Sequence, residues 1–100
     1  MLVHTVIFYL RSDLTESQKT EFRQEGLESL RAIKPVQALY VGAPAAIPPR
    51  PVVDASYTFA ITVLFADVAA HNAYQADPAH LAFVNRFKGC WTKVQIYDAE

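Results

Sequence analysis

LVHTVIFYL, residues 2–10, decides the fold of this chain of 100 residues. The stretch is dominated by branched and aromatic residues, which favour β-strands. Side chains alternate between the two faces of a strand, and here apolar side chains occur on both faces. A strand of this kind has to be covered on both sides. The stretch therefore predicts an inner strand of a sheet that packs against another layer on each face.

Helix signals follow this strand. Thr15 and Gln18 have the spacing of a capping box, and Lys34 precedes a proline, which disfavours helical backbone. A helix is therefore expected from about residue 15 to residue 34. Its apolar stripe, at helical spacing, consists of Phe22, Gly26, Leu27, Leu30 and Ile33.

Two further helical pieces are expected in the second half of the chain. Asp67 is a good N-cap for a short helix that reaches Tyr74. Asp77 caps a second piece, which ends at Gly89, and Pro78 takes its first helical position. Strands are expected at residues 36–41, 56–65 and 90–98, and a proline-rich loop occupies residues 43–55.

The predicted order of elements is β-α-β-β-α-β, within a single domain of residues 1–100. Two split β-α-β units with right-handed crossovers give an α+β, ferredoxin-like fold, in which a four-stranded antiparallel sheet carries its helices on one face. The other face then holds apolar residues such as Ile7, Tyr9, Trp91 and Tyr97 without a cover. A bare apolar face is unusual for a monomer, so a homodimer that forms a dimeric α/β barrel is expected.

Composition excludes several classes of partner. Nine basic and ten acidic residues give a net charge of −1, which provides no basic surface for nucleic acid. The longest apolar stretch, residues 57–68, is far shorter than the ~20 residues that span a bilayer, so no membrane partner is expected. The single cysteine, Cys90, excludes an internal disulfide and a cysteine zinc site. The first residues lack the charged and apolar segments of a signal peptide, so a cytoplasmic protein without one is expected.

The segment from Tyr74 to His80 is the first candidate for chemistry. If Asp77 caps the helix, His80 lies in its first turn, where the helix dipole disfavours a second proton on the imidazole. A neutral histidine accepts a proton, as a general base must. In the alternative interpretation, the histidine only hydrogen-bonds the turn and tightens the helix junction.

His4 is the second candidate, because it lies on the strand face assigned to the helices. An unpaired buried polar group costs about 1–3 kcal/mol, so His4 needs a partner. His80 or the Tyr74 hydroxyl is expected to supply it, which would create a polar end in an apolar cleft. The alternative is a single core histidine with a structural hydrogen bond.

Gly26, Leu30, Phe22 and His71 are predicted to line this cleft. Glycine at position 26 indicates either a close approach of the helix to the sheet or room for a ligand, and both interpretations place Gly26 over the sheet. His71 is expected mainly at the surface. The histidines lack HxxxH spacing and an obvious carboxylate partner, so no metal site is predicted. No phosphate-binding loop or other cofactor motif occurs, and no cofactor is expected.

Several short motifs occur in the order seen in a known family. They are the strand Leu-Val-His-Thr-Val-Ile-Phe, the Val-Gly that closes the second strand, Asp-Ala-Ser-Tyr, Phe-Ala-Asp, and Tyr74-x-x-x-Pro78-x-His80. With these motifs nearly the whole chain resembles the stress-responsive dimeric α/β barrel (Dabb) family. The resemblance implies a ferredoxin-like barrel made by two subunits, in agreement with the patterning.

One branch of that family consists of plant polyketide cyclases, which close linear chains by aldol condensation without a cofactor. By resemblance, His80 would be the base, Tyr74 would hold the substrate, and His4 would lie near the pocket. Gly26 departs from this branch, which has a tyrosine there, and His71 replaces an aliphatic residue.

Three functions follow as hypotheses. The first is a stress-responsive dimer with a pocket for a small apolar or polyketide-like ligand. The second is a polyketide cyclase with His80 as its base, and the third is a cofactor-free monooxygenase.

Overall fold

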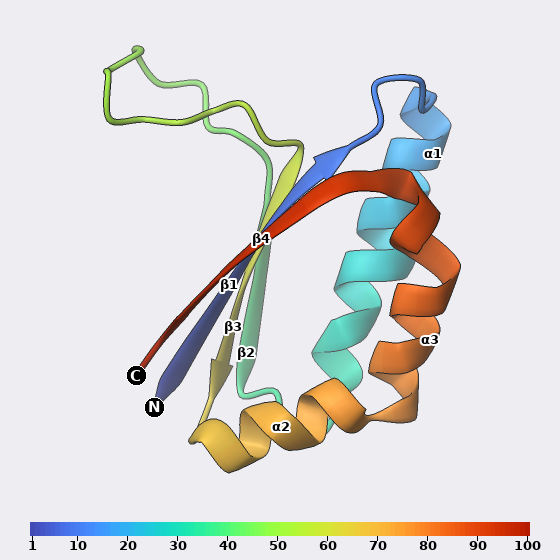
Figure 1. Cartoon of the computed structure of the whole chain (residues 1–100), viewed down its shortest axis with the longest axis vertical. Coiled ribbons are helices and arrows are strands. Elements are labelled where there is room, and N and C mark those ends of the chain that lie inside the picture. Colours follow the sequence, from blue (N-terminus) through green and yellow to red (C-terminus); the bar gives the residue numbers. More distant parts are fainter.

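Four antiparallel strands form one sheet in the order β2-β3-β1-β4 (Figure 1). The computed structural model describes residues 1–100. The strands are β1 (Leu2–Leu10), β2 (Ala38–Gly42), β3 (Phe59–Phe65) and β4 (Trp91–Ala99). This order, with β1 in the interior of the sheet, confirms the predicted ferredoxin-like fold.

The helical segments of residues 16–32 and 78–87 cover one face of this sheet, and the helix of residues 68–76 runs below the ends of the strands (Figure 1). The first begins as α1 (Glu16–Glu21) behind the predicted Thr15–Gln18 capping box, and then changes to a π-helical turn, η1 (Phe22–Gly26), and a 3₁₀ turn, η2 (Leu27–Ala32). The second half contains α2 (Val68–Ala76), α3 (Pro78–Phe87) and a short turn, η3 (Lys88–Cys90). Asp67 and Asp77 cap α2 and α3 as predicted.

The core lies between the sheet and the helices. In β1 the side chains of even-numbered residues point into it, and in β3 those of odd-numbered residues do. The register explains this match, because Val6 pairs with Ile61 on one side and with Ile96 on the other. The buried apolar residues are Leu2, Val6, Phe8, Phe22, Leu27, Leu30, Ile33, Leu39, Phe59, Ile61, Val63, Phe65, Tyr74, Phe83 and Phe87.

The third strand is shorter than predicted. It begins at Phe59 rather than at residue 56. The Asp54 carboxylate accepts hydrogen bonds from the backbone N–H and the hydroxyl of Ser56, and this local turn replaces ladder pairing there.

The predicted position of Trp91 on the outer face is wrong. The β1–β4 register shifts between Tyr9 and Leu10, and Trp91 pairs with Leu10. The shift reverses the alternation at this end of β4, because one added position exchanges the two faces of a strand. The partly buried indole ring packs against the core, with 5.5 Å between the centroids of its ring and the Phe8 ring.

The predicted position of Gly26 over the sheet is also wrong. Gly26 faces α3, where an added Cβ atom would lie 3.1 Å from a ring carbon of Phe83 and 3.1 Å from one of Phe87. The close approach that glycine permits is therefore between two helical segments. Their separation leaves no room for a side chain.

The face of the sheet away from the helices is only partly covered within one chain. Tyr97 is 62% exposed and Tyr40 is 63% exposed. The loop between β2 and β3 extends from the sheet on the side away from the helices (Figure 1). None of the helices has the length and apolar character needed to cross a lipid bilayer.

Candidate functional site

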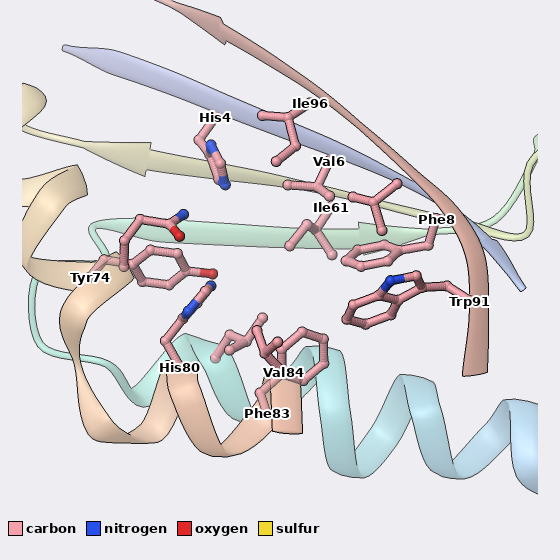
Figure 2. Close-up of a pocket in the computed structure, with 13 residues that line it drawn as sticks. His4, Val6, Phe8, Ile61, Tyr74, His80, Phe83, Val84, Trp91 and Ile96 are labelled. Carbon is pink, nitrogen blue, oxygen red and sulfur yellow. The ribbon is translucent and has the colours of Figure 1, made fainter. Parts of the chain in front are cut away.

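A cavity of about 280 Å³ lies between the sheet and the helices (Figure 2). One end is polar and carries His4, Tyr74, Gln75 and His80, and the remainder of the wall is apolar. The apolar part of the wall consists of Val6, Phe8, Leu30, Ile61, Phe83, Val84, Trp91, Val94 and Ile96. The arrangement suits a small ligand with one polar and one apolar end.

His80 extends from the first turn of α3 toward the cavity (Figure 2). The Asp77 carboxylate caps this helix by accepting a 2.8 Å hydrogen bond from the backbone N–H of Ala79, and Pro78 takes the first position. The cap and the proline fix the start of α3, and thereby the position of His80.

The Nδ1 atom of His80 is buried and has no hydrogen-bond partner. Burial lowers the pKa of His80 below 6.5, the neighbouring His4 and His71 lower it further, and Asp77 opposes them. The imidazole is therefore neutral near pH 7. A buried polar atom normally finds a partner, so the unpaired Nδ1 distinguishes His80 from the other polar groups of the cavity.

Tyr74 comes from the last turns of α2, and its side chain is almost completely buried. Its ring lies edge-on to the His80 imidazole, with 4.6 Å between ring centroids. Burial raises the pKa of the Tyr74 phenol, so the hydroxyl stays protonated and remains a hydrogen-bond donor. Figure 2 shows the Tyr74 hydroxyl and the His80 ring converging at the polar end of the cavity.

His4 enters this end from β1, and only 2% of the residue is exposed. Its hydrogen-bond partner is Asp98, with 2.5 Å between Nδ1 and Oδ1, rather than the expected His80 or Tyr74. Asp98 was absent from the residues predicted for the site. The antiparallel register of β1 and β4 places Asp98 beside His4. To predict this pair from the sequence, one would have needed the pairing register of these two strands.

His71 is partly buried and contacts His4, although it was expected mainly at the surface. It is partly buried on α2, and its ring packs edge-on against His4 with 5.0 Å between centroids. It lies outside the cavity wall, as do Phe22 and Gly26, whereas Leu30 belongs to the wall. His4, His71 and Asp98 each offer one ligand atom, and these three atoms lie within 4.8 Å of one another.

Sequence reasoning therefore identified the polar end and missed most of the apolar wall. The residues of that wall come from β1, η2, β3, α3 and β4, and all of them except the half-exposed Ile96 belong to the core or pack against it. Hydrophobic spacing places such residues in a core, but it does not show where the core leaves a space.

Comparisons with known proteins agree with this architecture. Olivetolic acid cyclase of Cannabis sativa is 25% identical over 95 residues, which are 95% of this chain and 91% of the cyclase. A Dabb-family protein of Mesorhizobium loti with a ferredoxin-like fold is 28% identical, with a TM-score of 0.81 over 99% of this chain and 94% of that one.

A dimeric ferredoxin-like protein of Thermobifida fusca has a TM-score of 0.76 at 19% identity, over 98% of this chain and 88% of that one. The family model of the stress-responsive A/B barrel domain matches residues 2–100. The predicted family is thereby confirmed, and the chain belongs to the stress-responsive A/B barrel (Dabb) domain family.

Proposed function

We propose that this protein is a cofactor-independent cyclase, which closes a short linear chain of alternating ketones by intramolecular aldol addition. The observation that carries the proposal is the buried, unpaired Nδ1 of His80 at the polar end of an otherwise apolar cavity. A base kept neutral and without a partner is suited to removing a proton from carbon. The similarity to olivetolic acid cyclase supports the same chemistry.

The reaction needs one proton transfer and one new carbon–carbon bond. Neutral His80 removes a proton from a methylene group between two carbonyls, and the resulting enolate carbon attacks a distant ketone carbon of the same chain. The oxygen of that ketone becomes an alkoxide and takes the proton back from His80. His80 is thereby neutral again, and no atom is gained or lost. The product is a cyclic isomer of the substrate.

Tyr74 would stabilise the oxygen on which negative charge develops. Its hydroxyl remains protonated because burial raises its pKa, and it lies on the same side of the cavity as His80. A donor placed where charge develops favours the transition state over the ground state. His4 keeps its hydrogen bond to Asp98 and forms the opposite wall of the polar end.

The apolar wall would supply substrate selection and folding of the chain. A cavity of about 280 Å³ lies near the lower limit of ordinary ligand sites, which are about 300–1,000 Å³. It therefore favours a short polyketone with a small apolar tail beside Phe8, Phe83 and Trp91. Confinement brings the two reacting carbons together and lowers the entropic part of the barrier.

The proposal includes a homodimer. The outer face of the sheet exposes Tyr40 and Tyr97, and an apolar face of this kind needs a cover. The same face of a second subunit, related by a two-fold axis, is the simplest cover. The dimeric protein of Thermobifida fusca shares the fold and supports this arrangement. Within one subunit the cavity lies on the opposite side of the sheet, so the dimer stabilises the site without contributing to its wall.

The test is ring closure by purified protein with a panel of linear β-polyketones of increasing tail length, followed by mass spectrometry and ultraviolet absorption. His80→Ala should reduce the rate about 10²–10⁴-fold through loss of the base. Tyr74→Phe should reduce it about 10²-fold, whereas Tyr40→Phe, which removes a phenol on the outer face of the sheet and away from the cavity, should leave it unchanged. Binding without turnover by the wild type, or turnover that persists in His80→Ala, contradicts the cyclase.

A further inference from the structure

We propose that His4, His71 and Asp98 form a binding site for a divalent transition-metal ion, with Zn²⁺ as the best fit, beside the polar end of the cavity. The inference is independent of the cyclase proposal, because it concerns two residues outside the cavity wall and is tested by metal binding alone.

Three elements bring the ligands together. His4 comes from β1, His71 from α2 and Asp98 from β4, so the cluster depends on the tertiary fold and not on a local motif. Their candidate ligand atoms lie within 4.8 Å of one another. Bonds of about 2.1 Å to a tetrahedral ion require donors about 3.4 Å apart. The largest separation thus needs a closure of about 1.4 Å, which side-chain rotation of His71 or Asp98 can supply.

The donor set matches a transition metal better than a hard cation. Two imidazoles and one carboxylate are ligands of Zn²⁺, and imidazole disfavours Ca²⁺ and Mg²⁺ relative to it. Three protein ligands leave further coordination positions for water or for a ligand oxygen. Since His4 also lines the cavity, an ion held here would lie next to the space that a ligand would occupy.

The electrostatic surroundings also favour a cation. Asp98 forms no ion pair with lysine or arginine, and its carboxylate pairs with the His4 ring alone. The cluster supplies one carboxylate charge toward a divalent ion, and imidazole binds metal through a neutral ring nitrogen. His71 makes a single side-chain hydrogen bond, 3.1 Å from Nδ1 to the amide oxygen of its neighbour Asn72, so one ring nitrogen remains free.

Entry of the ion breaks one existing hydrogen bond, and this loss lowers the affinity. The existing hydrogen bond between His4 and Asp98 must open, because the ion takes the place of the shared proton. The 41% exposed side chain of Asp98 gives the ion a route from solvent.

The experiment is titration of the metal-free, full-length protein with Co²⁺, monitored by its visible absorption, and with Zn²⁺ by calorimetry. One ion per chain is expected, with the absorption of a four- or five-coordinate centre that includes nitrogen ligands. His71→Ala and Asp98→Asn should each weaken binding at least about tenfold, the usual effect of even an outer-sphere partner. Circular dichroism and thermal melting establish that these variants fold.

Two controls separate this site from other donors of the chain. His80→Gln removes the third histidine of the sequence and Cys90→Ser removes its single thiol, and neither residue belongs to the cluster. Both variants should bind Co²⁺ and Zn²⁺ as the wild type does. Wild-type affinity equal to that of His71→Ala, or loss of binding in either control, overturns the site. A competition with Mg²⁺ in large excess should leave the bound Co²⁺ in place.

Discussion

Replacement of Gly26 by alanine should destabilise the protein, although alanine is the better helix former. Gly26 packs against α3, and an added Cβ would lie 3.1 Å from Phe83 Cε1, 3.1 Å from Phe87 Cε2 and 3.2 Å from Phe87 Cδ2. These ring atoms have little freedom to move away. Phe83 and Phe87 are both buried, and both contact the Phe22 ring at 5.5–6.1 Å between centroids.

Two opposing contributions set the magnitude. Alanine in place of glycine within a helix is worth about 0.5–1 kcal/mol in favour of the variant. An extra methyl group in a well-packed core costs typically about 1–3 kcal/mol. The two ranges together give a net loss of about 0–2.5 kcal/mol for Gly26→Ala, with a central value of about 1 kcal/mol. For a domain of this size, each kcal/mol lowers the melting temperature by about 4–8 °C.

The matched control is Gly89→Ala. No atom lies within 4 Å of the Cβ added there, and Gly89 has no positive φ angle. This variant should be neutral or slightly more stable than the wild type, because alanine restricts the unfolded chain. Thermal and urea unfolding of both variants, followed by circular dichroism, give the comparison. A Gly26→Ala protein at least as stable as the wild type would show that the aromatic rings yield, and would refute the reasoning.

The same variant also connects packing to the cavity. Phe83 forms part of the cavity wall, so a methyl group at position 26 that pushes the Phe83 ring away changes the shape of the cavity. A ligand that fills the apolar end should then bind more weakly to Gly26→Ala than to Gly89→Ala. Equal affinities would indicate that the strain is absorbed by Phe87 or by the backbone.

Three further predictions test the helix start, the buried base and the outer face. Burial lowers the pKa of His80 below 6.5 in the folded protein, so the unfolded chain binds more protons than the folded one as the pH falls below 6.5. The contribution of neutral, buried His80 to the free energy of unfolding is therefore fully present above pH 6.5 and decreases as the pH falls below that value. His80→Gln should show a smaller fall in urea midpoint between about pH 7 and pH 5 than the wild type, and an equal fall counts against the burial argument. Asp77→Ala removes the cap of α3 and should lower the free energy of unfolding, measured by thermal unfolding, by about 1 kcal/mol. Asp77→Asn should keep most of the wild-type stability, because asparagine is also a good N-cap. Identical stability of the two variants contradicts a capping role. Tyr97→Lys places a charge on the outer face and should halve the mass measured by light scattering, while Leu81→Lys on α3 should not; a monomeric wild type rejects the interface.

Local signals in the sequence were reliable guides to the elements. Thr15, Asp67 and Asp77 cap helices as predicted, because capping depends on a few consecutive residues. Apolar stretches with strand-forming residues located the four strands, and their order determined the topology. Boundaries were less accurate. The Asp54–Ser56 turn shortens β3 through hydrogen bonds that are not evident from hydrophobicity.

The site was predictable only in part, because local motifs can be read from the sequence and long-range contacts cannot. His80 and Tyr74 lie in one short segment with a recognisable motif, and the structure brings them together with His4. The partnership of His4 with Asp98 depends on strand register, and the inward position of Trp91 depends on a register shift beside Leu10. Neither is encoded in the neighbouring residues alone. Long-range packing likewise decides that Gly26 faces α3.

The pairing of β1 with β4 has a consequence for how the chain reaches its folded state. Val3 pairs with Ala99, so β1 needs as its neighbour β4, which is synthesised after the other three strands of the sheet. Contacts between residues so distant in sequence slow folding, because a large loop must close before they form. The hydrophobic strand of residues 2–10 therefore remains half-paired until synthesis of residues 91–99, and a nascent chain stalled before that point should engage chaperones that bind exposed apolar segments.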